Sequence, residues 1–385
     1  MTVRDSSKPM RLAMIGLATA ALIALLAILP SFHFPPPSAP PIIHVIMAIG
    51  IMPLIMGAMI YFTPVLTRTR MPSWPMLLVP VVALMAGIMA TSSLVWRRDL
   101  LFIPAVLAIS ATGAMLAWMW RRTRTMLGRP HPGQYWYLGA LVCLLWGLTA
   151  IFVATRWPEY WSSLRRFHIH ANILGFIGLT AFGTLRVLLP TAASYTDPVS
   201  RQRLQADLYP VLFGTLLISM GSAWWTWLVW PGLVLWLVPL VRFAWPLVTS
   251  WRRYVWGWHR SSSSLGFAVL GLIVVLSAGS LHAMALWPAA ATLQLFFLLF
   301  LFPLVTGAIS YLLPAWLWQV RDTSAYEMAA RRLAWGSGAR MLVFFTAGTM
   351  AWNGISGGLY LAAGAVALFL LQVVLTLWAY FLRKI

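Results

Sequence analysis

Long apolar blocks, separated by short polar or basic segments, run through the whole chain. An α-helix needs ~20 residues to cross the hydrocarbon core of a bilayer, and the blocks are close to that length. The pattern predicts an all-α polytopic membrane protein with about 12 transmembrane helices. The predicted spans cover residues 12–29, 42–66, 75–95, 101–120, 135–154, 166–190, 208–228, 229–248, 265–283, 289–313, 341–355 and 359–382.

Three of these blocks end in the same way, with a glycine and a proline seven residues apart: Gly57 and Pro64, Gly183 and Pro190, Gly307 and Pro314. Twenty residues before each closing proline stands a polar residue: His44, His170 and Gln294. A fixed internal period is a strong indication of a repeated structural unit. We therefore expect one transmembrane domain built from three copies of a four-helix unit in pseudo-threefold order, roughly residues 1–130, 131–255 and 256–385.

The composition supports a membrane protein and argues against a soluble one. Hydrophobic residues make up 61% of the 385 residues and charged residues only 9%, which is far from the balance of soluble domains. The net charge of +20 does not indicate nucleic-acid binding, because the arginines stand in short loops between apolar blocks. The lipid bilayer is the expected partner. The single cysteine, Cys143, lies in an apolar block and is expected to serve packing.

The basic residues also predict a topology. Of the 27 Lys and Arg residues, 20 fall on the side of the N-terminus and five on the other side, while Arg186 and Arg242 lie within spans. Positive charge favours the cytoplasmic side. We expect a multi-pass protein of the bacterial inner membrane with both termini in the cytoplasm, and with the first span retained as a helix.

Four histidines share the outer side of this topology. His44 opens the second span, His168 and His170 open the sixth, and His282 closes the ninth. Imidazole is the commonest metal ligand in proteins and also serves as an axial ligand of haem iron. The four residues predict a haem or metal site. The alternative is that each is an interfacial histidine hydrogen-bonded to water or to a carbonyl.

Helical spacing assigns separate roles to the paired histidines. At about 100° per residue, His168 and His170 point about 200° apart, so they serve different sites. Asn172 falls near the side of His170, where it could orient a ligand or a ligating histidine, or form a hydrogen bond between helices. Gln294 occupies the third repeat position and marks the copy without a ligand.

Two segments resemble a known superfamily. HVIMAIGIMPLIMGAMIYFTPVL, residues 44–66, is similar to the second span of haem–copper oxidase subunit I, where a haem-ligating histidine precedes M-P-x-x-I-G-G and a closing V-P. HIHANILGFIGLTAFGTLRVLLPT, residues 168–191, resembles spans of the small NnrS-like haem- and copper-binding membrane proteins linked to nitric oxide stress. The resemblance covers spans two, six and ten. It implies the oxidase architecture, haem b on His44 and one of His168 or His170, and His282 as a further ligand with copper as its candidate metal.

The chain also departs from the oxidases. It lacks their adjacent His-His pair, and no predicted span contains Asp or Glu, whereas proton-conducting proteins use carboxylates within the membrane. We expect a haem or haem–copper protein that does not pump protons, acts in nitric oxide or respiratory redox physiology and receives electrons from a periplasmic or membrane donor. The alternatives are a secondary transporter or permease, or a structural membrane component without cofactors. The sequence leaves the substrate and any enzymatic activity open.

Overall fold

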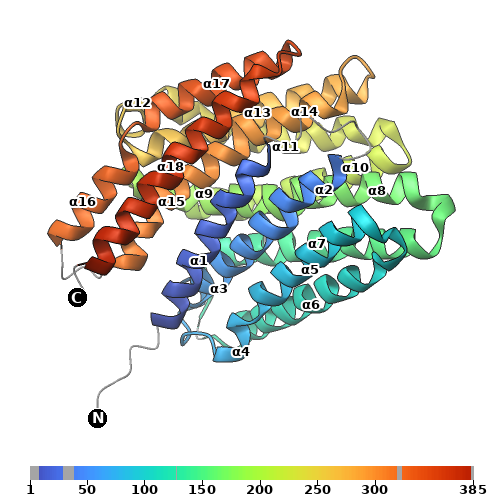
Figure 1. The fold of residues 1–385 in the computed structure, drawn as a ribbon, viewed down its shortest axis with the longest axis horizontal. Coiled ribbons are helices and arrows are strands. Elements are labelled where there is room, and N and C mark those ends of the chain that lie inside the picture. Colours follow the sequence, from blue (N-terminus) through green and yellow to red (C-terminus); the bar gives the residue numbers. More distant parts are fainter. Residues whose placement is uncertain (1–7, 29–38, 127, 319–322, 383–385) are drawn as a thin grey trace. The chain divides into compact units, whose positions relative to one another are not determined.

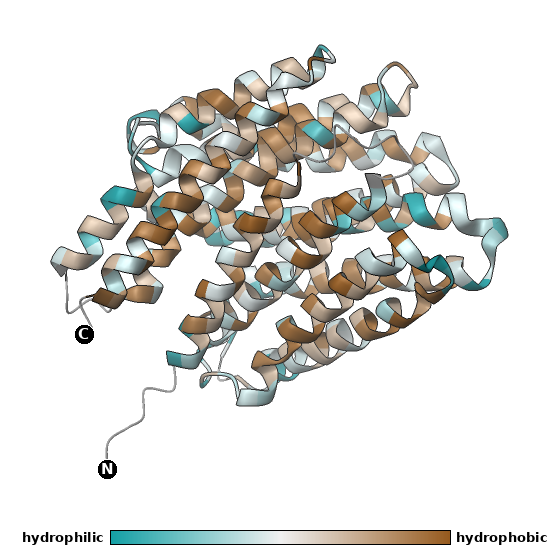
Figure 2. Ribbon diagram, viewed as in Figure 1, coloured by the Kyte–Doolittle hydropathy of each residue, from teal (hydrophilic) through white to brown (hydrophobic). Residues whose placement is uncertain are grey.

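The computed structural model describes residues 8–28, 39–126, 128–318 and 323–382, and every regular element within them is helical (Figure 1). In the described part of the chain, 11 helices are long and apolar enough to cross a membrane. Figure 2 shows hydrophobic residues along the lengths of these helices, with hydrophilic residues concentrated at their ends and in the connections. The prediction of an all-α, multi-pass membrane protein is confirmed.

The longer α-helices follow one another along the chain with short connections. They are α1 (Lys8–Leu25), α3 (Met52–Thr67), α5 (Val79–Trp96), α6 (Phe102–Thr125), α7 (Gly133–Arg156), α8 (Trp161–His170), α9 (Thr180–Ala192), α10 (Ser200–Ala223), α11 (Val229–Val248), α13 (Ser261–Ala283), α15 (Phe302–Leu317), α16 (Thr323–Ala334), α17 (Ser337–Trp352) and α18 (Gly357–Leu382). Shorter α-helices are α2 (Ala39–His44), α4 (Trp74–Leu77), α12 (Arg252–Val255) and α14 (Ala289–Leu295). Three segments have π-helical spacing: η3 (Val45–Ile51), η6 (Ala171–Leu179) and η8 (Phe296–Leu301).

The eleventh expected span corresponds to a helix that is shorter than a full span. Residues 341–355 were expected to cross the membrane, and the corresponding helix α17 has 16 residues, fewer than the ~20 of a full span. Its first turn includes Arg340, whose guanidinium lies 4.4 Å above the ring of Phe369 in α18. The described structure thus has 11 helices of spanning length and one shorter helix, α17, in the place of the eleventh expected span.

Helix α10 corrects the prediction that no acidic residue lies within a span. It begins at Ser200, eight residues before the expected start of this span at 208, because the polar segment before it consists mainly of residues that favour helices. Asp207 is therefore part of the helix, and its side chain is fully buried. The other described acids are exposed or half-buried. Glu327 lies in α16, and the rest, such as Asp99, lie in the connections between the long helices.

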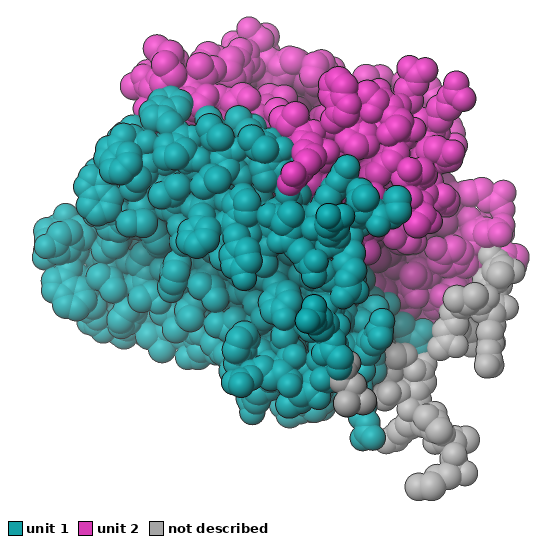
Figure 3. Space-filling view, turned by 180° about the vertical axis from the view of Figure 1, so that it is seen from behind, with its two compact units in different colours: residues 1–24, 33–184, 198–239 teal, residues 25–32, 185–197, 240–385 magenta. Residues whose placement is uncertain are grey.

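The chain divides into two compact units, coloured separately in Figure 3. Unit 1 comprises residues 1–24, 33–184 and 198–239, and unit 2 comprises residues 25–32, 185–197 and 240–385. In unit 1, Trp136 stacks on Phe182, and Phe182 meets Trp236 edge to face. All three side chains are almost fully buried. These large rings fill the space between α7, α9 and α11 and fix the helix that carries His168 and His170.

Unit 2 has an aromatic core of its own. Phe302 in α15 packs edge-on against Phe344 in α17, with ring centroids 5.7 Å apart. Arg186, fully buried, lies with its guanidinium 4.2 Å above the ring of Phe243. A cation over an aromatic face recovers part of the free energy that burial of the charge costs.

Candidate functional site

The three helices that carry His44, His170 and Gln294 share an irregularity of the backbone. Each changes from α to π spacing within two residues of its polar residue, at Val45, Ala171 and Phe296. Segments of π-helix are rare, and they are frequently found at functional sites. The repeat position found in the sequence therefore coincides with a repeated feature of local structure.

Proline explains two of the three π segments. Pro53 and Pro303 stand at the start of α3 and α15, directly after η3 and η8. Because proline has no N–H, the carbonyl four residues earlier lacks its usual α-helical donor. Pairing with the fifth residue, as in a π-helix, reaches the N–H just beyond the proline. In η6 the corresponding residue is Leu179, so the π segment there forms without a proline.

Two of the π segments press their backbone against a glycine of a neighbouring helix. A Cβ atom at Gly87 in α5 would overlap the carbonyl of Ala48 in η3, and one at Gly271 in α13 would overlap the carbonyl of Leu299 in η8. Only glycine permits such an approach. The widened backbone is thus held in place by the packing of the adjacent span.

His44 and His170 make the same hydrogen bond. The Nδ1 atom of His44 lies 2.8 Å from the carbonyl oxygen of Pro40, and Nδ1 of His170 lies 2.9 Å from that of Arg166. In both cases the acceptor is four residues earlier in the same helix. The two residues therefore have matching local geometry as well as matching positions in the repeat.

The other two histidines bond to carbonyls outside their own turn. Nδ1 of His168 lies 2.9 Å from the carbonyl oxygen of Gly147 in α7. Nδ1 of His282, at the exposed end of α13, lies 3.1 Å from the carbonyl oxygen of Trp287. Together with His44 and His170, we call them the span-end histidines.

These bonds determine the tautomer of the span-end histidines. A carbonyl oxygen can only accept, so Nδ1 must carry the hydrogen, and a neutral ring then has its lone pair on Nε2. Metal-ligating histidines are commonly fixed in this way, with one ring nitrogen donating to a carbonyl and the other free to coordinate. For His44, His170 and His282 this state suits coordination through Nε2. At His168 the amide Nδ2 of Asn172 also lies 3.5 Å from Nε2, so the amide would have to move for that atom to coordinate.

Two of these rings come together within unit 1. The imidazoles of His44 and His168 are close enough to interact electrostatically. Both side chains are partly buried at the ends of their helices. Unit 1 thus places a histidine of the second expected span in the neighbourhood of one of the sixth.

Asn172 lies beside His168 and not beside His170, which corrects the expectation from the sequence. Its Nδ2 atom lies 3.1 Å from Nδ1 of His168 and donates to the backbone carbonyl of His168 at 2.8 Å. Residues four apart share one face of a helix, so the partner of Asn172 is the histidine four positions before it. The Oδ1 atom is buried, with no hydrogen-bond partner in the described structure.

Two further histidines, here called the loop histidines, have the opposite bonding. Nδ1 of His131 accepts the backbone N–H of Gly133 at 3.1 Å, and Nδ1 of His259 accepts that of Gly336 at 3.0 Å. Partial burial, together with the charge of Arg201, lowers the pKa of His131. These rings act as fixed acceptors that close turns, in agreement with their expected place in loops.

The described residues hold no group of three or more His, Cys, Asp or Glu side chains that could bind a metal ion. In this part of the chain, His44 and His168 are therefore a pair of neighbouring imidazoles and not part of a larger set of such ligands. In unit 2, His282 is exposed at the end of α13, and Gln294 is half-buried in α14. The carbonyl of Gly147, the partner of His168, could not be identified from the sequence, because no local pattern pairs residues 21 positions apart.

The sequence was also compared with known proteins. No family of related sequences matches the chain, and no curated protein matches it.

Proposed function

We propose that this chain is a haem-binding protein of a bacterial inner membrane that acts in nitric oxide or respiratory redox physiology. The observation that carries the proposal is the pair His44 and His168. Their rings lie in the same neighbourhood of unit 1, and in both Nδ1 is within hydrogen-bond distance of a carbonyl, which places the lone pair of the neutral ring on Nε2. Haem b is the simplest cofactor for such a pair, and His170 is the alternative partner of His44.

The architecture in this proposal is that of haem–copper oxidase subunit I and its NnrS-like relatives, with three four-helix units in pseudo-threefold order. Its support is the resemblance of spans two, six and ten, together with the π segment that follows the polar position in each. The matching bonds of His44 and His170 agree with it. Gln294 then represents the copy whose position holds no ligand.

The residues around the pair have supporting roles. When bound, haem supplies an iron centre that changes its oxidation state. His44 and His168 would hold this group through their imidazoles, and such a pair of ligands would suit electron transfer from a periplasmic or membrane donor. The carbonyl of Gly147 fixes the tautomer of His168, and Asn172 restricts the orientation of the same ring. His282 is the candidate for an additional ligand, for which copper is the proposed metal.

The absorption spectrum of the full-length protein, purified from haem-replete cells, tests the proposal. The wild type is expected to show a Soret band. His44→Ala and His168→Ala are expected to abolish or shift it, while His131→Ala and His259→Ala leave it unchanged. Metal analysis of the same preparations tests for copper, and His282→Ala is expected to remove it. A wild-type protein with neither a Soret band nor copper contradicts the proposal.

The proposed topology has a test of its own. Both termini lie in the cytoplasm only if the short helix α17 crosses the membrane. Reporter fusions after residues 37, 197 and 385 are expected to be periplasmic, cytoplasmic and cytoplasmic, in that order. A periplasmic reporter after residue 385 would show that α17 does not cross, and a reversal of the first two would invert the placement of the histidines.

A secondary transporter is the second candidate function. The observation that favours it is Asp207, a fully buried carboxylate within a helix of spanning length, since such groups often mark ion or substrate pathways. Asp207→Asn distinguishes the two. If the protein binds haem, the Asp207→Asn variant keeps the Soret band. If the protein is a transporter, no haem is present and the variant changes substrate uptake into proteoliposomes.

A further inference from the structure

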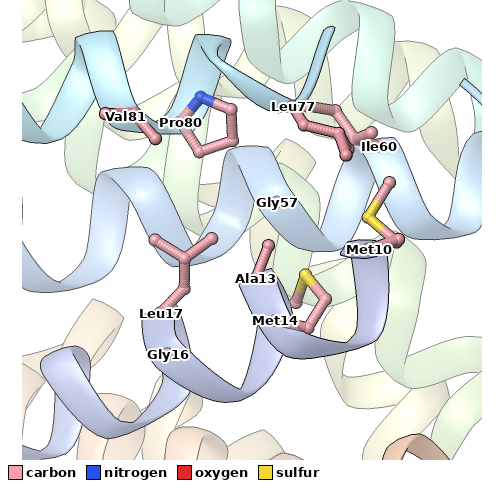
Figure 4. Close-up of a pocket in the computed structure, with 10 residues that line it drawn as sticks. All are labelled: Met10, Ala13, Met14, Gly16, Leu17, Gly57, Ile60, Leu77, Pro80 and Val81. Carbon is pink, nitrogen blue, oxygen red and sulfur yellow. The ribbon is translucent and has the colours of Figure 1, made fainter. Parts of the chain in front are cut away.

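Unit 1 contains an apolar pocket between α1, α3, α4 and α5, with a volume of about 190 Å³ (Figure 4). Its walls include Met10, Gly16, Gly57, Leu77 and Val81. Every side chain that lines it is apolar, so it offers no hydrogen bond to a polar ligand. The volume equals that of about six water molecules at ~30 Å³ each, which suits a stretch of hydrocarbon chain and not a bulky ring system with polar substituents.

The helices around this pocket belong to the membrane-spanning set. Helices α1, α3 and α5 lie within the candidate spans Lys8–Ile28, Pro40–Thr67 and Trp74–Trp96. The wall formed by α1 is open at Gly16, because a Cβ added there would meet no atom within 4 Å. In Figure 4, Gly16 and Leu17 lie on α1, and Pro80 and Val81 lie across the pocket on α5. A lipid chain beside α1 can therefore enter the pocket from the hydrocarbon layer.

The contacts between α1 and α3 show which charges lie at the end of the pocket. A Cβ at Gly50 would meet Ala21 and Ala24, and one at Gly57 would meet Met14 and Leu17. Going forward from Gly50 in η3 to Gly57 in α3 moves the contact about seven residues backward in α1. The two helices are therefore antiparallel. A further step of seven brings the end of α3 beside the start of α1.

That end of the pocket is basic. Lys8 is exposed at the start of α1, and Arg68 and Arg70 are exposed directly after α3. Trp74, the first residue of α4, is 65% exposed, as is common for an indole at the level of lipid headgroups. An apolar pocket next to three exposed cations and an interfacial tryptophan is complementary to a lipid with a negatively charged headgroup.

We propose that this pocket binds one acyl chain of an anionic phospholipid whose phosphate lies against Lys8, Arg68 and Arg70. The apolar walls hold the chain, and the cations select the headgroup. Each basic residue near the phosphate is expected to favour an anionic over a zwitterionic lipid by about fivefold. This lipid site does not depend on whether the protein binds haem.

Native mass spectrometry of the delipidated full-length protein tests the proposal, with phosphatidylglycerol and phosphatidylcholine of identical acyl chains as probes. The wild type is expected to retain one phosphatidylglycerol more tightly than phosphatidylcholine. Gly16→Leu adds a side chain at the open edge of the pocket and is expected to weaken both lipids by about fourfold for each methylene displaced. Arg68→Gln combined with Arg70→Gln is expected to lower the preference for phosphatidylglycerol by about 25-fold, with the part due to Lys8 remaining, and to leave phosphatidylcholine binding unchanged.

The matched control is Gly364→Leu in α18, where an added Cβ likewise meets no atom within 4 Å. It is expected to bind both lipids as the wild type does. Val81→Phe fills the pocket from the opposite wall and provides the measurement if Gly16→Leu does not fold. Wild-type binding by both pocket-filling variants overturns the proposal. The proposal is also overturned if inorganic phosphate competes with phosphatidylglycerol at equal concentration. It is likewise overturned if the wild type is a dimer that Gly16→Leu converts to a monomer.

Discussion

The span-end histidines and the loop histidines use the same ring nitrogen in opposite ways. In His44, His168, His170 and His282, Nδ1 donates to a backbone carbonyl. In His131 and His259, Nδ1 accepts from a backbone N–H. The backbone therefore selects the tautomer, and the tautomer decides whether Nε2 has a lone pair for coordination or a hydrogen to donate. This difference separates candidate ligands from structural residues more sharply than their position along the chain does.

The largest expected effect is a complete reversal of protonation between the two groups. In solid-state NMR of the haem-free protein with nitrogen-15-labelled histidine, at a pH where the rings are neutral, Nδ1 is expected to be protonated in the span-end histidines. Nε2 is expected to be protonated in the loop histidines. Single His→Ala variants assign the signals. An unprotonated Nδ1 at His44 or His168 would remove the structural basis of the proposed ligand pair.

A substitution at Gly147 is expected to have the next largest effect. A Cβ atom there would lie 3.0 Å from Nδ2 of Asn172, so Gly147→Leu displaces the amide beside His168. Loss of a group that orients a metal ligand typically lowers affinity by about 10- to 100-fold. We expect haem occupancy at limiting haem to fall by at least about tenfold, as measured by the Soret band. Gly113→Leu, at a position in α6 where a Cβ meets no atom within 4 Å, is the control and should bind haem normally.

His131 is expected to make the stability of the protein depend on pH. Burial and Arg201 lower the pKa of His131 below its ordinary value of 6.5, so the unfolded chain takes up a proton at a higher pH than the folded protein does. The contribution of His131 to stability is present above about pH 6.5 and is lost as the pH falls through the lower pKa of the folded state. Protonation also removes the acceptor of the Gly133 N–H.

Thermal unfolding between pH 7.5 and 5.5 measures this contribution. The wild type is expected to lose more stability on acidification than His131→Asn does. Arg201→Gln, which leaves the burial of His131 in place, is expected to show an intermediate loss. Equal slopes for the wild type and His131→Asn would show that the ring does not titrate in this range.

The smallest expected effect concerns the stacking of His259 on Trp335, whose ring centroids are 6.0 Å apart with an interplanar angle of 6°. Trp335 is 64% exposed, so Trp335→Leu is expected to lower the free energy of unfolding by about 0.5 kcal/mol. The Nδ1 bond to Gly336 should persist, because it depends on the backbone. A change in the tautomer of His259 in this variant would mean that the tryptophan, and not the turn, selects it.

Local sequence patterns were sufficient to predict the helices and most of their limits. Apolar blocks identify spans because the bilayer imposes a fixed length on each of them. The same criterion misplaced the end of α17, which stops at Trp352 whereas the expected span reached residue 355. It also failed at Asp207, because a helix can continue beyond the apolar block that reveals it.

The candidate site was predictable only in part. The repeat spacing identified His44, His170 and Gln294, and their shared α-to-π change agrees with it. The contact of His168 with Gly147 depends on how α7 packs against α8, and helical spacing within one segment contains no information on that packing. Asn172 was assigned to the wrong histidine for a simpler reason, since the side of a helix was judged from the angle to His170 and not from the i to i+4 relation to His168.

A π segment contains one residue more than the α-helical turn it replaces, so it corresponds to a single-residue insertion that the helix absorbed without losing its course. In the proposed three-unit arrangement, the insertion stands at the same point in each copy. Side chains around it have since diverged so far that one copy has Gln294 where the others have histidine. In that arrangement, the extra residue is a feature common to the three copies that does not require the side chains around it to be the same.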